Sequence, residues 1–195
     1  MSMITPSQTV GPFFAYGLTP NGRYAWNDLA NNDLVTPDVV ESRIQIEGAL
    51  YDGDGVPVPD GMIEIWQADG RGRFPGGQGV NGAPSNTAFK GFGRCATDAN
   101  GEFKFSTVKP GATEDPAGGR QAAHIMVAVF ARGMLVHAFT RLYFEDDPDI
   151  AADPVLQCVP ADRRETLIAR RQADGAVYRF DIHLQGDRET VFFDI

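Results

Sequence analysis

The sequence predicts a mainly β protein, an antiparallel β-sandwich with an irregular N-terminal arm and one short helix. Three observations favour this class. Apolar and polar residues alternate along several short segments, clusters of turn-forming residues separate these segments, and one segment carries the signals of a helix start. The chain has 195 residues, of which 43% are hydrophobic, so it is long and apolar enough to bury a core of its own.

Strands are expected wherever the hydrophobic period is two. Ile44, Ile46 and Leu50 alternate with polar residues and predict a half-buried strand that begins at Arg43. Further strands are predicted at residues 62–67, 92–97, 102–107, 122–130, 134–144, 177–184 and 189–193. Residues 98–101, Asp-Ala-Asn-Gly, predict a hairpin between the two strands that flank them.

Local signals place one helix and one further turn. Pro160 precedes Asp162 and Glu165, which have the spacing of a capping box, and together they predict a helix that runs to about Arg171. Asp52 opens the segment Asp-Gly-Asp-Gly, which we interpret as a hairpin turn. A calcium loop would need a third acidic position and a distal glutamate, and this segment has neither.

The chain is expected to have two parts, an N-terminal arm at 1–40 and a β-sandwich domain at 41–195. The arm shows neither helix nor strand periodicity and is rich in proline and glycine, but it also holds five aromatic residues. Disordered tails are usually poor in aromatic residues. We therefore expect the arm to lie against a surface, either of its own domain or of a partner.

Charge and composition exclude several classes of function. The formal net charge of −9 disfavours binding to nucleic acid and to anionic membranes. No apolar run approaches the roughly 18 residues of a membrane span, and the first residues lack the pattern of a signal peptide. A cytoplasmic location is expected, with Cys95 and Cys158 as reduced, buried thiols.

The residues alone do not predict a catalytic or metal site. Two ligands on one strand face would be two residues apart, and His124 has Met126 at that position. A thioether is soft and does not suit a hard ferric ion. His137 and His183 have no histidine at that spacing either, so each histidine is expected to pack or to lie at the surface. No serine lies in a nucleophile elbow, and no glycine loop precedes a helix.

A series of short motifs nevertheless resembles a known family. In order along the chain these are Gly48, Pro57-Val58-Pro59, residues 63–69 (IEIWQAD), Phe92-Gly93-Arg94, Thr97-Asp98, residues 107–111 (TVKPG), Ala123-His124-Ile125 and Leu142-Tyr143-Phe144. The series resembles the intradiol ring-cleavage dioxygenases over residues 43–195. That resemblance implies a β-sandwich with a non-haem ferric ion, held by two tyrosines and two histidines, that opens a catechol ring between its hydroxyls with O₂.

The sequence departs from the ligand set that this resemblance implies. Tyrosines are expected at 74 and 113, where the chain has Phe74 and Thr113. A second histidine is expected at 126, where Met126 replaces it, so that His124 alone remains as a vestigial ligand. An arginine expected at 121 is Gln121. The resemblance therefore implies a subunit that binds no metal itself, with Fe³⁺ in a partner.

The two ends of the chain resemble more specifically a non-metal α subunit of this family. Such a subunit implies an αβ hetero-oligomer with a homologous, iron-bearing β subunit, and a shared site for a small aromatic substrate and O₂. By position, Thr9, Pro12 and Phe13 in the arm and Arg132 in a turn are the expected substrate-binding residues. Alternatively the arm only packs, and Arg132 lies in an ordinary solvated turn.

Two other classes of function stay open from the sequence. The chain could be a stand-alone β-sandwich module for binding or transport, which co-purification with an iron-bearing chain would exclude. It could also be a self-sufficient dioxygenase with unusual ligands, which a metal assay on the isolated chain would test.

Overall fold

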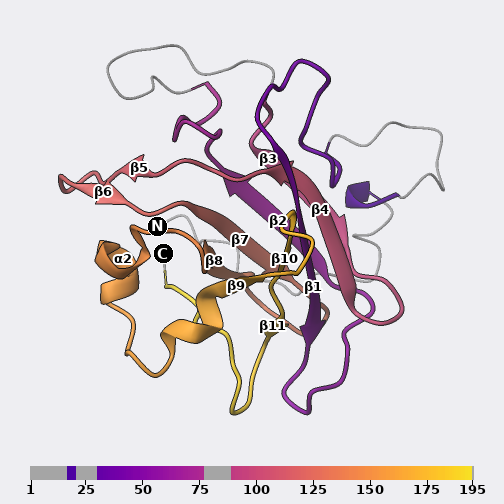
Figure 1. Ribbon diagram of the computed structural model, residues 1–195. Helices are drawn as coiled ribbons and strands as arrows, with labels where there is room; N and C mark the ends of the chain where they lie inside the picture. The colour runs from indigo at the N-terminus through magenta and orange to yellow at the C-terminus, as the bar shows by residue number, and fades with distance from the viewer. Residues whose placement is uncertain (1–16, 21–29, 77–88, 195) are drawn as a thin grey trace, which may run out of the picture.

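The computed structural model describes residues 17–20, 30–76 and 89–194, and every structural statement below refers to these. The chain is mainly β (Figure 1), which confirms the predicted class. The strands are β1 (Arg43–Tyr51), β2 (Met62–Gln67), β3 (Phe92–Ala96), β4 (Glu102–Val108), β5 (Thr113–Glu114), β6 (Arg120–Gln121), β7 (His124–Phe130), β8 (Ala138–Phe144), β9 (Ile168–Arg171), β10 (Val177–Arg179) and β11 (Ile182–His183). The short helices are η2 (Ile150–Ala152), α2 (Pro154–Gln157) and η3 (Arg164–Leu167).

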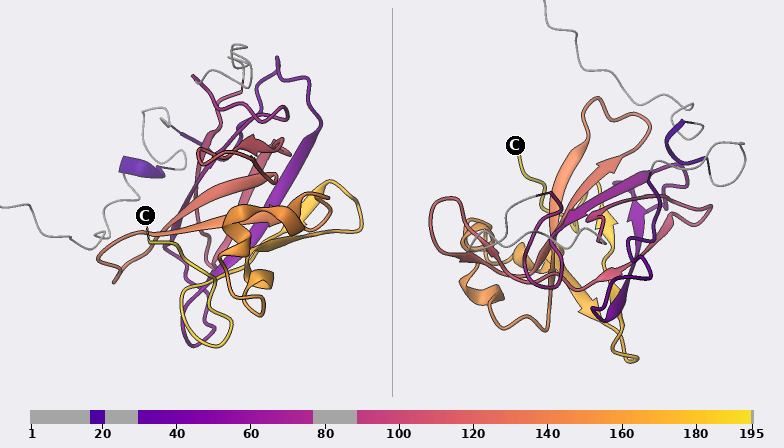
Figure 2. Two further views of the ribbon diagram at one scale, coloured as in Figure 1. Left: turned by 90° about the vertical axis from the view of Figure 1, so that its left-hand side faces the viewer. Right: turned by 90° about the horizontal axis from the view of Figure 1, so that it is seen from above.

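The strands form a sheet that folds over to enclose one core (Figure 1, Figure 2). Its order is β11-β1-β10-β9-β8-β7-β2-β3, and β4 pairs with β1. Apolar side chains from both halves meet in a single cluster, for example Ile46 of β1, Phe105 of β4, Ile63 of β2 and Ile125 of β7. The two layers of a sandwich are thus two halves of one sheet. β5 and β6 form a separate ribbon beside α2.

Strand pairing differs from the prediction in two respects. Six pairings are antiparallel, but β1 pairs in parallel with β10 and β11, and β8 pairs in parallel with β9. The hairpin predicted at 98–101 is wrong. The turn forms, since Gly101 donates its N–H to the Asp98 carbonyl at 3.0 Å. However, β3 pairs with β2 and β4 pairs with β1, so this turn carries the chain between layers.

The helix predicted at 160–171 is also wrong. Its first half contains only the short 3₁₀ turn η3, and no side chain caps this turn. Its second half is β9, where Ile168 pairs with Tyr143 of β8 and Ala169 is fully buried. Pairing and burial against β8 override the local capping signal here, because helix propensity is a weak preference.

The remaining predictions give mixed results. The turn at Asp52 is confirmed, since its Oδ1 accepts the Val56 N–H at 2.8 Å. The strand predicted at 189–193 is only an isolated bridge between Phe193 and Phe139. Cys158 is exposed, so the expectation of a buried thiol was wrong there.

The end of the predicted arm is partly described. Leu34 is fully buried in the core, and its N–H donates to the Ser106 carbonyl of β4 at 2.9 Å. The boundary at residue 40 stays a prediction. No helix in the described part of the chain is long and apolar enough to cross a membrane.

Candidate functional site

The outer face of β7 and β8 carries the residues to which the resemblance points. Successive side chains on a strand point to opposite faces. Ile125 and Val127 lie in the core, so His124 and Met126 lie on the other face of β7. Met126 is directly opposite Arg141 on β8 and Trp66 on β2. Residues opposite one another share a face, so Trp66, Met126 and Arg141 form one row across three strands.

His124 is held in a neutral state at one end of this face. Its Nδ1 lies 2.8 Å from the Ala122 carbonyl, and this contact favours the tautomer with the proton on Nδ1 and a free lone pair on Nε2. Burial lowers the pKa of His124 below its ordinary value, and the nearby positive charge of Arg141 acts in the same direction. A neutral imidazole with a free Nε2 can accept a hydrogen bond.

Phe74 lies in a loop that a buried carboxylate organises. Asp69 accepts two hydrogen bonds from the side chain of Arg73, at 2.9 Å and 2.7 Å, and further bonds from the backbone N–H groups of Arg71 and Arg73. This loop places the Phe74 ring parallel to Trp66, with the ring centroids 5.9 Å apart. The position expected to be a tyrosine therefore packs beside the row that contains Met126.

The loop that leads into Thr113 packs closely against the loop that contains Phe74. The Gly111 N–H donates to the Asp69 carbonyl at 2.9 Å. Gly72 has a positive φ of 75°, and a Cβ there would lie 2.0 Å from the Ala112 carbonyl oxygen, so only glycine fits this close approach. Thr113 itself is buried and pairs with Gln121 across the β5–β6 ribbon.

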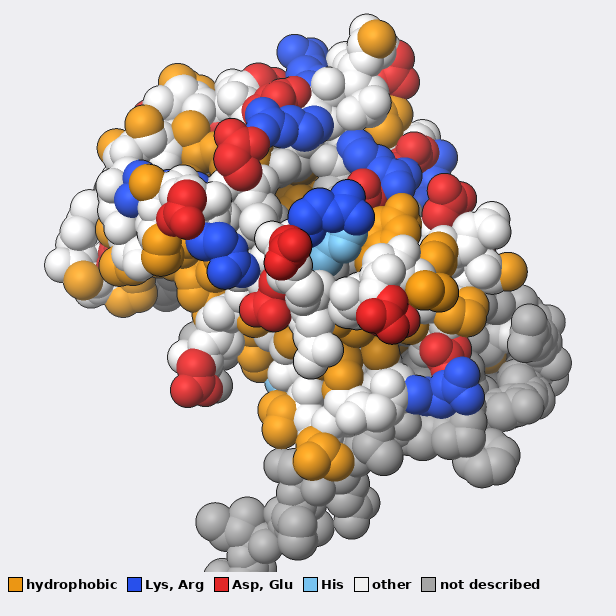
Figure 3. All heavy atoms as spheres, turned by 90° about the horizontal axis from the view of Figure 1, so that it is seen from below, with side chains coloured by type: hydrophobic (Ala, Val, Ile, Leu, Met, Phe, Trp, Pro, Cys, Tyr) orange, Lys and Arg blue, Asp and Glu red, His pale blue; other side chains and the backbone are white. Residues whose placement is uncertain are grey.

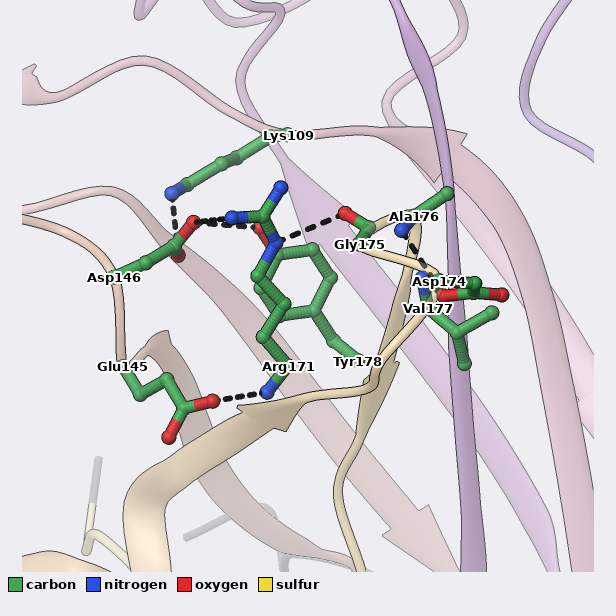
Figure 4. A network of polar contacts seen from close by, with 9 residues as sticks. All are labelled: Lys109, Glu145, Asp146, Arg171, Asp174, Gly175, Ala176, Val177 and Tyr178. Carbon is green, nitrogen blue, oxygen red and sulfur yellow. Dashed lines mark hydrogen bonds and ion pairs between the residues drawn. The ribbon is translucent and has the colours of Figure 1, made fainter.

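A second contact network fixes the start of the Thr113 loop (Figure 4). The Lys109 ammonium lies 2.7 Å from Asp146 Oδ1 and also lies over the Phe144 ring, 5.3 Å from its centroid. The Tyr178 hydroxyl donates to the other carboxylate oxygen of Asp146 at 3.0 Å, and Arg171 lies 3.7 Å from that oxygen. These contacts join the ends of β4, β8, β9 and β10.

Arg141 links the two sides of the site. Its Nη1 donates to Gln121 Oε1 at 3.0 Å and lies 3.4 Å from the Tyr143 hydroxyl. That hydroxyl donates to the fully buried Asp153 at 2.8 Å, and Asp153 accepts the Ala122 N–H at 2.9 Å. Burial raises the pKa of Tyr143, which therefore stays protonated as a donor. Arg141 thus contacts the residue that stands where the resemblance expects an arginine.

The residues in this site do not fit a ferric ion. Phe74 has no donor atom, the neutral Thr113 hydroxyl is a weak ligand and the Met126 thioether is soft. His124 is one suitable ligand, and the fixed positive charge of Arg141 repels a cation. No group of three or more His, Cys, Asp or Glu side chains is placed to hold a metal ion within the residues described.

The structure thus gathers the predicted positions but reveals a residue that sequence reasoning missed. His124 and Met126 share the outer face of β7, Phe74 packs against Trp66 in the row that contains Met126, and Thr113 pairs with Gln121 on the β5–β6 ribbon. Arg141 was not predicted to take part. In the sequence, Arg141 is recognisable only as an arginine on a predicted strand between two aromatic residues. Its place in the site depends on the register between β7 and β8, which the sequence does not show.

Arg132 lies apart from this cluster. His124 is the first residue of β7, and Arg132 follows the other end of this strand. The strand has seven residues and spans roughly 20 Å. Its side chain is 60% exposed, and its Nε makes an ion pair with Asp60. The other predicted substrate contacts, Thr9, Pro12 and Phe13, lie outside the described residues.

The other histidines pack against aromatic rings. His183 stacks on Tyr51 with a centroid distance of 4.8 Å, and His137 lies against Phe130 and Phe139. On the face shown in Figure 3, basic and acidic side chains are interspersed. Such a mixed surface is unlike the continuous basic patch of a nucleic-acid interface.

Comparisons with known proteins show the family of the chain. The model of the dioxygenase family matches residues 11–186. The protocatechuate 3,4-dioxygenase α chain of Burkholderia cepacia is 46% identical, with 98% of this chain and 97% of that one covered. The β chain of the same organism is 35% identical, with 84% of this chain and 73% of that one covered.

A solved structure has the same fold. It is the dioxygenase domain of a dioxygenase and carbohydrate-binding protein fusion from Streptomyces sp. SirexAA-E, with a TM-score of 0.61 and 22% identity. The similarity covers 93% of this chain and 99% of that one. From the family match and the identity to its relatives, this chain belongs to the dioxygenase family, in its intradiol branch.

Proposed function

We propose that the chain is the non-metal α subunit of a protocatechuate 3,4-dioxygenase. In this role it supports the O₂-dependent intradiol cleavage of 3,4-dihydroxybenzoate to 3-carboxy-cis,cis-muconate, a step of the β-ketoadipate pathway in the cytoplasm. The observation that carries the proposal is the composition of the site. A nearly full-length α-chain relative is 46% identical, and three of the four expected ligand positions carry residues that do not suit a ferric ion.

The partner in this proposal is a homologous β subunit that holds Fe³⁺. Separate α and β chain relatives exist in one organism, and both are similar to this chain over most of its length. Their coexistence supports an αβ assembly. The part of the chain that the structure describes supplies no donor set for the metal, so its proposed contribution is to shape and charge the partner's pocket.

Arg132 is the proposed contact to the substrate carboxylate. Its guanidinium is largely exposed, and the ion pair with Asp60 engages Nε. The two terminal nitrogens can donate to a carboxylate, which is the group that distinguishes protocatechuate from catechol. Thr9, Pro12 and Phe13 are proposed to line the same pocket from the arm. In the alternative, Asp60 and Arg132 only close the turn after β7.

Reconstitution tests the proposal. The full chain and its β partner are purified separately, mixed, and assayed for ring cleavage, with native mass analysis of the product. We expect an αβ complex whose turnover of protocatechuate needs both chains. A chain that never associates with the β subunit would be a stand-alone module, and turnover by the chain alone would make it a self-sufficient dioxygenase.

A further inference from the structure

The end of the arm lies between two edge strands of the sheet. β3 is the last strand of the sheet order, and β4 pairs only with β1 among the described strands. The Arg94 N–H of β3 donates to the Asn31 carbonyl at 3.0 Å, and the Ser106 N–H of β4 donates to the Asn32 carbonyl at 2.8 Å. Unpaired strand edges invite pairing with other chains. Residues 31–34 therefore cover part of both edges with this chain's own backbone.

The Phe92-Gly93-Arg94 motif on β3 fits this part of the arm. A Cβ at position 93 would lie 2.5 Å from Leu34 Cδ1, so Gly93 leaves the space that the fully buried Leu34 side chain occupies. The glycine and the arginine of this motif thus serve one purpose, which is to receive the arm on β3.

Arg94 holds the arm a second time, through its side chain. Its Nη1 donates to the Leu18 carbonyl at 3.4 Å. Its Nε donates to Glu64 Oε1 of β2 at 2.7 Å, and Nη2 lies 2.6 Å from the same oxygen. The guanidinium also lies over the Phe92 ring, 5.7 Å from its centroid. The Arg94 side chain is only 15% exposed, so Glu64 and Phe92 fix the position from which it binds the arm.

The two contacts of Arg94 lie on either side of residues 21–29. The backbone N–H binds Asn31 after this segment, and the guanidinium binds Leu18 before it. One residue of the domain therefore contacts the arm at two points that are far apart along the chain.

The Leu18 contact lies within reach of Arg132. Arg94 is opposite Glu64, and Glu64 is opposite Ala128 of β7, so all three lie on the outer face. Arg132 is four residues beyond Ala128, at most roughly 13 Å along the strand, and two strand spacings of about 4.8 Å separate β3 from β7.

The arm is long enough to cover this separation. Phe13 precedes Leu18 by five residues, which can span up to roughly 17 Å. An arm held at Leu18 can thus bring Phe13 to the region of Arg132, and one pocket can receive both residues.

We infer that Arg94 is a positioning residue for the reaction of the αβ enzyme. It holds the arm on the outer face of β2 and β3, and so sets the point from which the arm residues reach the partner's pocket. This inference rests on the proposed function, in which Thr9, Pro12 and Phe13 line that pocket.

Steady-state kinetics of the reconstituted enzyme test this role with Arg94→Lys. A lysine keeps the ion pair with Glu64, and hence the fold, but lacks the planar fork that also reaches Leu18. The loss of one hydrogen bond corresponds to about two-fold to ten-fold in affinity. We expect KM to rise by this factor for protocatechuate and for catechol alike, with kcat almost unchanged, because the arm and not the carboxylate contact is displaced. An unchanged KM would overturn the inference.

A matched control and a double variant separate positioning from general packing. Arg43 also donates to a carbonyl of the arm at 3.4 Å, that of Val35, but Arg43→Ala should leave KM unchanged because this contact follows Asn31. If Arg94 acts through the arm, Arg94→Lys should raise KM less in a Phe13→Ala chain than in the wild-type chain. Equal rises in the two chains would overturn the inference.

Limited proteolysis of the full, isolated chain reads the anchor without the partner. Trypsin cleavage after Arg23, which lies between the two contact points in the sequence, is followed by mass spectrometry. We expect Arg94→Lys to accelerate this cleavage by about two-fold to ten-fold, since cleavage follows the population of the released arm. Equal rates in wild type and variant would overturn the inference. Failure of the proposed function would instead appear as a wild-type chain that forms no active αβ complex.

Discussion

The Arg141 guanidinium donates a 3.0 Å hydrogen bond to the side-chain oxygen of Gln121. This contact joins β8 to the β5–β6 ribbon. It places a permanent positive charge between Thr113, which pairs with Gln121, and Met126, which lies opposite Arg141. Thr113 and Met126 stand at two of the four positions where the resemblance expects iron ligands. The positive charge between them in this chain is that of Arg141.

Removal of the Asp153 carboxylate should strongly destabilise the fold. Asp153 is fully buried and accepts hydrogen bonds from the Tyr143 hydroxyl and from the backbone N–H groups of Ala122 and Leu156. Asp153→Ala leaves these donors buried without an acceptor, at a cost of roughly 1–3 kcal/mol each. We expect the free energy of unfolding to fall by about 3 kcal/mol or more in urea denaturation.

Tyr143→Phe is the matched control, since it removes one of these hydrogen bonds and keeps the ring. Its expected cost is about 1 kcal/mol. If Asp153→Ala cost no more than Tyr143→Phe, the carboxylate would not organise this end of the site.

The Asp146 network predicts a stability that depends on pH. Partial burial alone would raise the pKa of Asp146, but the hydrogen bonds from Lys109 and Tyr178 outweigh it and hold that pKa below its ordinary value. A carboxyl with a lowered folded-state pKa binds protons more readily when the chain unfolds. Its stabilisation is present above the unfolded value, about 4, and is lost as the pH falls through the folded value.

Urea denaturation of wild type and Asp146→Asn at several pH values measures this contribution. The difference in unfolding free energy should be largest near neutral pH and shrink below about pH 4. Tyr178 has a pKa raised to about 12, so its hydroxyl stays protonated over this range. A difference that stays constant with pH would show that the ionised carboxylate contributes nothing.

Arg132→Ala tests the proposed contact to the substrate carboxylate. In the reconstituted enzyme we expect KM for protocatechuate to rise about ten-fold to 150-fold, the equivalent of one charge-assisted hydrogen bond. The carboxylate is remote from the reacting carbons, so kcat should change little if binding is equal in the ground and transition states. Steady-state kinetics with catechol, which lacks the carboxylate, should show almost no change.

Two results would contradict this role for Arg132. An equal effect on protocatechuate and catechol would indicate a defect in packing or assembly, and no effect on either would return Arg132 to an ordinary turn paired with Asp60. Asp60→Asn is a useful control, because it removes the ion pair and keeps the guanidinium. Its KM for protocatechuate should stay well below that of Arg132→Ala.

The sequence predicts strands well because one buried face imposes a period of two, as in β1 and β2. It predicts pairing less well, because pairing depends on contacts distant in sequence. The turn at 98–101 has every local feature of a hairpin, yet its two strands lie in different layers. Likewise Ala169 lies in a segment with the signals of a helix, but burial and pairing against β8 stabilise it as part of a strand.

The site divides in the same way. The positions of Phe74, Thr113, His124 and Met126 could be located from the sequence, because the short motifs around them are present although the ligand residues are replaced. The role of Arg141 could not be predicted, since it depends on the register that places β8 opposite Met126 and on the reach of one side chain to Gln121.

The central claim is that this chain binds no iron and completes the site of a partner that does. The most direct measurement is iron content with visible absorption, first on the isolated chain and then on the αβ complex. The account predicts a colourless, iron-free chain and one iron per αβ unit, with iron content and turnover unchanged by His124→Ala. Stoichiometric iron with a tyrosinate-to-iron absorption band in the isolated chain, or two irons per αβ unit, would contradict it.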